Sequence, residues 1–167
     1  MTPFAESLLF VWRKNGKRAQ DLFANIPDAR MTEQSGGLTN HAAWCLSHLN
    51  LYHAAIVNLA RGEAVADPAK APDAEKYGNG SKPVTDPKVY LPRAELIARF
   101  TEGHAQVEAA LADAACDVFK SEPNLERWKS FFGTGGAGLA YLMLYHETHH
   151  LAEIANWKKA LGIPVVG

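Results

Sequence analysis

The chain has 167 residues, a net charge of -1 and 47% hydrophobic residues, a composition typical of one globular domain rather than a disordered or fibrous protein. It has no basic run that would favour nucleic-acid binding, no apolar run of the roughly 18 residues that span a bilayer, and no signal-peptide pattern. Its two cysteines are too few for a disulfide framework. We therefore expect a single domain, residues 1–167, located in the cytoplasm, with neither nucleic-acid nor membrane partners.

Apolar residues recur at helical spacing in four segments of the chain, and no segment alternates in the manner of a strand. Proline and glycine residues flank these segments, as they do at the ends of helices. The predicted helices run from Phe4 to about Ile26, from about His41 to Arg61, from about Pro92 to Ala115, and from Gly133 to about Leu161. The sequence thus predicts an all-α four-helix bundle.

The connection between the second and third helices, residues 62–91, is rich in proline and turn residues and shows no sustained periodicity. A connection of this length without regular structure is unusual inside a compact domain. It is long enough to return along the whole bundle, which would make helices two and three parallel. It could also cover a site.

Two histidines of the fourth helix, His146 and His150, are four residues apart. At about 100° per residue they lie about 40° apart and one turn along the helix, so both can reach one metal ion. They project from the apolar side of the helix, where Leu142, Met143 and Ile154 also lie. The alternative is a pair of buried histidines that side-chain partners satisfy.

His48 is the best candidate for a third ligand, because it lies on the apolar side of the second helix at about the same height. Three neutral imidazoles leave one coordination position open, as in catalytic zinc sites. Zinc or nickel fits this ligand set best, and iron, manganese or copper is also compatible with it. Taken alone, His48 would be interpreted as a histidine of the core, and the nearby pair His146 and His150 reverses that interpretation.

The runs Asn40–Leu49 and His146–Glu153, together with the tail Trp157–Gly162, resemble the DinB-like superfamily. This resemblance implies an up-down-down-up bundle in which three histidines, here His48, His146 and His150, hold a divalent metal. Members include thiol-dependent S-transferases and a maleylpyruvate isomerase, often as dimers. The resemblance thus implies a small-molecule substrate, such as a low-molecular-weight thiol, and a homodimer. One departure is that Ala152-Glu153 replaces the usual Gly-Gln.

Five further residues are expected to hold the ligands in place or to line the pocket: His149, Glu153, Tyr52, Cys45 and Trp44. Glu153 could anchor His149 or His150. Tyr52 could donate a hydrogen bond to a metal-bound water, although a core role is the simpler interpretation. Cys45 is expected to be a buried thiol rather than a nucleophile. The sequence assigns no catalytic residue.

Three other polar residues are expected to lie outside the site. Glu147, about 100° around the helix from His146, is expected to face solvent. His53 is expected at the surface or an interface because it lies about 140° from His48. His104 is expected at the surface or at the edge of the core.

These observations lead to three hypotheses of function. The first is a metal-dependent enzyme of S-transferase or hydrolase type, in which the metal activates a thiol or water. The second is a stress protein that binds a metal or ligand without turnover. The third is a bundle without metal that acts as a dimeric interaction module.

Overall fold

All regular elements in the computed structural model, which describes residues 1–34 and 36–165, are helical, apart from one isolated bridge between Ala64 and Asn124. The predicted all-α class is therefore confirmed. No helix within the described ranges is both long and apolar enough to cross a membrane.

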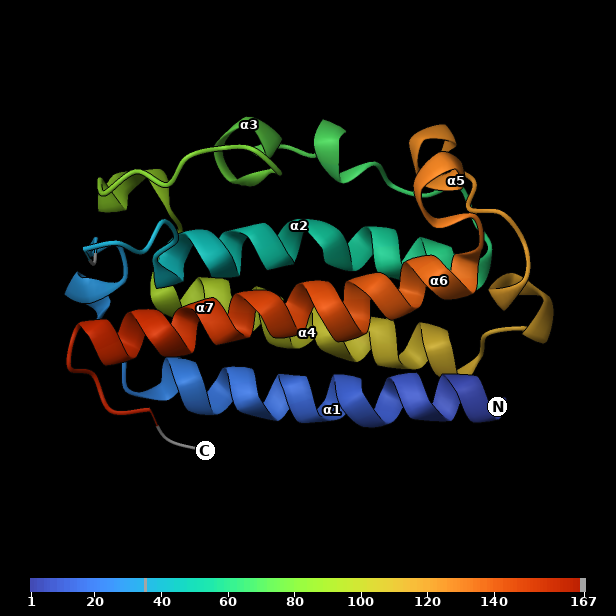
Figure 1. The fold of residues 1–167 in the computed structure, drawn as a ribbon, viewed down its shortest axis with the longest axis horizontal. Coiled ribbons are helices and arrows are strands. Elements are labelled where there is room, and N and C mark those ends of the chain that lie inside the picture. Colours follow the sequence, from blue (N-terminus) through green and yellow to red (C-terminus); the bar gives the residue numbers. More distant parts are fainter. Residues whose placement is uncertain (35, 166–167) are drawn as a thin grey trace.

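Four long helical segments lie side by side in the structure (Figure 1). The first and the last run in one direction, and the second and third run in the other (Figure 1). Both α1 and α2 pack against α4 and against the last segment. The segments are α1 (Pro3–Ala24), α2 (Ala42–Arg61), α4 (Arg93–Ala112), and the succession α6 (Gly135–Ala140), η5 (Tyr141–His146) and α7 (Glu147–Ala160).

The ends of these helices follow from local sequence. The Thr2 hydroxyl accepts a hydrogen bond from the amide of Ala5, and Pro3 occupies the first turn of α1, where its missing N–H is not needed. His41 caps α2, because its Nδ1 accepts a hydrogen bond from the amide of Trp44. Gly62 ends α2 at a φ of 70°, a left-handed conformation that favours glycine.

The connection of residues 62–91 runs alongside α2 (Figure 1). It contains η2 (Pro68–Lys70), the short helix α3 (Ala74–Tyr77) and η3 (Pro87–Val89), so it is less irregular than the sequence indicated. The described chain also contains η1 (Asp28–Arg30), η4 (Cys116–Phe119) and α5 (Glu126–Phe132).

The apolar core consists of two clusters, one around Phe23, Phe100 and Trp157 and the other around Trp12 and Met143. Each of the four long segments contributes to both clusters. Where one cluster gives way to the other, near the middle of each segment, the chain places polar side chains. We call them the polar layer: Asn15, His48, His53, His104, His146, Glu147 and His150.

Candidate metal centre

One side of the polar layer brings together His48 from α2, His146 from the end of η5 and His150 from α7. Their potential ligand atoms all lie within 4.8 Å of one another. Nε2 of His48 is 2.9 Å from Nε2 of His146. The three histidines that the sequence singled out therefore meet across the bundle.

Hydrogen bonds on the far side of two rings fix their tautomers. Nδ1 of His48 lies 2.5 Å from the carbonyl oxygen of Tyr77, which can only accept, so the His48 Nδ1–H donates. Nδ1 of His150 lies 2.7 Å from a carboxylate oxygen of Glu153 and donates to it in the same way. Nε2 of both rings is then left with a free lone pair. Metal-binding histidines characteristically have such partners.

The environment also keeps the rings of His48 and His146 neutral. Burial, together with the charge that the neighbouring imidazoles would carry, lowers the pKa of His48 to about 4 and that of His146 to about 2. Two facing nitrogen lone pairs 2.9 Å apart repel unless a proton or a cation lies between them. A proton can bridge only two of the three rings, whereas a cation can bind all three. The donor set therefore fits a divalent metal.

Glu153 links this cluster to the segment that leads into α2. Its carboxylate accepts hydrogen bonds from Asn40 Nδ2 at 3.1 Å and from His150, as the sequence predicted for one of the two neighbouring histidines. Burial opposes ionisation, but these hydrogen bonds prevail and lower the pKa of Glu153. Burial and the adjacent Glu153 charge raise the pKa of Cys45. Cys45 is thus a buried, protonated thiol, as expected.

A cavity of about 550 Å³ opens beside the three histidines. Trp44 stacks on His48 with a ring separation of 4.7 Å and donates its Nε1–H to the Ser81 hydroxyl. The Tyr52 ring lies 4.6 Å from that of His146. His149 lines the cavity and is exposed. Because Asn79, Gly80 and Ser81 also line it, the 62–91 connection forms part of its wall.

The match to known families agrees with this geometry. The model of the DinB superfamily matches residues 12–154, a stretch that includes all three histidines. The chain belongs to the DinB superfamily. Neither a search of curated proteins nor a search of solved structures returned a significant match.

Two expectations about this DinB-superfamily chain are wrong. Glu147 is only 2% exposed and His53 only 5% exposed, although both were expected at the surface. The reason is geometric: α2 and α7 each pack against neighbours on two sides, so each has a buried arc much wider than one line of residues.

His104 is also largely buried, with its side chain 11% exposed, and its Nε2 lies 2.9 Å from Oε2 of Glu147. Together with His53 these residues form a second cluster whose potential ligand atoms lie within 4.8 Å of one another. The sequence offered one signal for it, namely glycines in the middle of α1 and α4, Gly16 and Gly103.

Proposed function

We propose that this DinB-superfamily chain is a metal-dependent enzyme in which His48, His146 and His150 hold a divalent cation at the floor of the 550 Å³ cavity. The observation that supports it best is the pairing of two Nδ1–H groups with Tyr77 and Glu153, which leaves both Nε2 atoms free to bind. A divalent cation held there lowers the pKa of a bound thiol or water and so supplies a nucleophile at neutral pH.

The residues around the cluster hold the ligands in fixed positions. Trp44 limits rotation of the His48 ring by stacking on it, and the 62–91 connection fixes the other side through the Tyr77 carbonyl. Asn40 binds both carboxylate oxygens of Glu153, which in turn orients His150. Such partners typically contribute about 10–100-fold to metal affinity.

The cavity wall favours a small substrate with an apolar part and a negative group. Its aromatic rings provide apolar surface, and among the described lining residues Arg127 is the only arginine, lysine, aspartate or glutamate. Arg127 also pairs with Asp67, which fixes its position at the wall. We propose a low-molecular-weight thiol and a small electrophile as the reactants of an S-transferase, with hydrolysis as the second possibility. The aromatic lining residues are Trp44, Tyr52, Trp128, Phe131, Phe132, Tyr141 and Tyr145.

The proposed fold is an up-down-down-up four-helix bundle. The directions of the four long segments in Figure 1 and the contacts of α1 and α2 with both α4 and α7 support this topology. In it, residues near the middle of α2 and of the last segment (α6, η5 and α7) meet in the interior, as the three histidines require.

The test is metal analysis of protein purified without a histidine tag, followed by a screen of thiols with electrophiles. His48→Ala and His150→Ala should each remove one equivalent of cation per chain and abolish turnover. His149→Ala is the matched control, because it removes a neighbouring histidine that is 53% exposed and lies outside the three-histidine cluster.

Unchanged cation content in both cluster variants would contradict the proposal. If the cluster variants lose the cation but the wild type turns over none of the tested thiols and electrophiles, the alternative is favoured. That alternative is a protein that binds a metal or ligand without catalysis.

A further inference from the structure

The other side of the polar layer contains His53 from α2, His104 from α4 and Glu147 from α7. None of these residues belongs to the three-histidine cluster, although Glu147 follows His146 directly. His104 and Glu147 are 2.9 Å apart through Nε2 and Oε2. The rings of His53 and His104 meet edge to face with centroids 5.7 Å apart.

Two atoms of this cluster lack a hydrogen-bond partner among the described residues. They are Nε2 of His53 and Oε1 of Glu147, and neither is accessible to solvent. Leaving a buried polar atom unpaired is unfavourable, because the atom has lost its hydrogen bond to water and gained none in return. Two such atoms among three neighbouring side chains indicate that the cluster is built around a ligand that satisfies both.

The backbone is shaped to hold the two imidazoles. A Cβ atom at Gly103 would come within 2.0 Å of Nδ1 of His53, and one at Gly16 within 2.8 Å of Nδ1 of His104. Glycine in the middle of a helix is destabilising relative to alanine, so its presence at both positions is consistent with the need for this space. Trp12 stacks on His104 at 3.8 Å, nearly parallel, and donates its Nε1–H to the His104 carbonyl. Both rings are thus held in place without a ligand.

Two imidazoles and one carboxylate form a ligand set that binds iron(II), manganese, cobalt or zinc. Burial lowers the pKa of both His53 and His104 to about 3, which leaves them neutral, as ligands must be. A proton shared between Nε2 of His104 and Oε2 of Glu147 would leave both Nε2 of His53 and Oε1 of Glu147 without a partner. We propose that His53, His104 and Glu147 form a second, interior site for a divalent transition-metal cation, independent of the three-histidine site.

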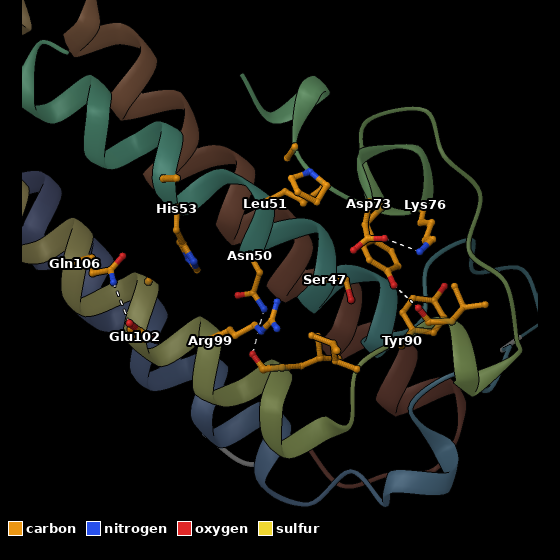
Figure 2. A pocket seen from close by; sticks show the side chains of 18 of the residues that line it. Ser47, Asn50, Leu51, His53, Asp73, Lys76, Tyr90, Arg99, Glu102 and Gln106 are labelled. Carbon is orange, nitrogen blue, oxygen red and sulfur yellow. Dashed lines mark hydrogen bonds and ion pairs between the residues drawn. The ribbon is translucent and has the colours of Figure 1, made fainter. Parts of the chain in front are cut away.

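One member of the cluster, His53, lines a cavity. This separate cavity of about 660 Å³ lies among α2, α4 and the 62–91 connection, and its lining includes His53 and Gly103. Figure 2 shows His53 extending from α2 toward α4 at this cavity. Two carboxylates, Asp73 and Glu102, also line the cavity. A cation can therefore approach His53 without passing the three-histidine cluster.

The test counts cations in variants that each remove one site. Chains are stripped with a chelator, loaded with Zn²⁺ or Co²⁺, desalted and measured by mass spectrometry of the metal. The wild type should retain two cations per chain, and Glu147→Gln should retain one. The double variant His48→Ala/His150→Ala should also retain one, and should lose it when His53→Leu is added. His149→Ala should retain two.

Glu147→Gln guards against misfolding, because glutamine keeps the size of the side chain and its hydrogen bonds but not the carboxylate ligand. Circular dichroism confirms that each variant is folded. The proposal is overturned if the wild type retains one cation that Glu147→Gln also retains. It is equally overturned if the double variant is folded and retains none. The two sites are removed by different substitutions. If the second site is absent, the proposed function at the three-histidine site still stands, and if the three-histidine site is absent, the second site can still be tested.

Discussion

The two histidine clusters lie at the same height of one bundle, yet their surroundings differ. The cluster of His48, His146 and His150 faces a cavity and holds its rings through partners outside the cluster, such as Tyr77 and Glu153. In the cluster of His53, His104 and Glu147, two buried polar atoms have no hydrogen-bond partner among the described residues, both rings pack closely against helix glycines, and only His53 lines a cavity. The first can admit a substrate, whereas the second can bind only something as small as a cation or a water molecule.

The difference shows how one polar layer can serve two purposes. The last helical segment contributes to both clusters through adjacent residues, His146 at the end of η5 and Glu147 at the start of α7, which point to different sides of the helix. Variants that distinguish the clusters should therefore separate effects on cation affinity from effects on stability.

The largest separation is expected between His150→Ala and His53→Ala. His150→Ala removes a ligand at the cavity and should weaken cation binding there by more than about 100-fold. Losing only a residue that orients a ligand typically costs about 10–100-fold, and losing the ligand itself should cost more. His53→Ala leaves a void between α2 and α4 and should lower the free energy of unfolding of the metal-free chain by about 2–4 kcal/mol. Cation titration and urea denaturation measure the two effects. If His150→Ala and His53→Ala lower the free energy of unfolding of the metal-free chain equally, the two clusters do not differ in their contribution to stability.

Gly103→Ala should destabilise the protein by about 1–3 kcal/mol, because the new methyl group collides with His53. In an exposed helix the same change is stabilising by up to about 1 kcal/mol. The sign of the change in urea denaturation is thus the informative result. Pairing it with His53→Ala provides the control: with the ring removed, Gly103→Ala should no longer destabilise. If Gly103→Ala stabilises the otherwise wild-type protein, glycine is not needed at position 103 to make room for the His53 ring.

Glu153→Gln should weaken cation binding at the three-histidine cluster by about 10-fold, because a neutral amide orients His150 less strongly than a carboxylate does. The interior cluster should be unaffected. Titration with Co²⁺, followed by its visible absorption, measures the affinity. Asn40→Ala loosens the same carboxylate and should act in the same direction. An unchanged affinity in both variants would mean that Glu153 does not position His150.

Trp12→Phe should have the smallest effect, about 1 kcal/mol in the free energy of unfolding, because it removes the hydrogen bond from Nε1 to the His104 carbonyl but keeps an aromatic ring. Thermal unfolding of the metal-free chain measures it. Cation affinity at the three-histidine cluster should match that of the wild type. A loss of affinity there would reveal that the two clusters are coupled.

The sequence was informative where local spacing decides the geometry. The four-residue separation of His146 and His150 holds because His146, the last residue of η5, immediately precedes the α-helix α7, in which His150 lies. The position of His48 followed from its height on α2. The positions predicted for Glu147 and His53 were wrong because only one line of residues along each helix was expected to be buried. A helix that packs against two neighbours buries a much wider arc of its surface. Which side chains face each other across that arc depends on how helices distant in sequence are packed.

The segment η5, Tyr141–His146, has a consequence for comparing relatives of this chain. A π-helical turn spaces its hydrogen bonds five residues apart instead of four. The helix therefore absorbs one extra residue without turning either flank away from its neighbours. A relative lacking this turn should have one residue fewer in the middle of an otherwise continuous helix. It should keep both the packing of α6 (Gly135–Ala140) against its neighbours and the pair of histidines that corresponds to His146 and His150. An alignment gap at that point would mark a change in helix winding, not the loss of the site.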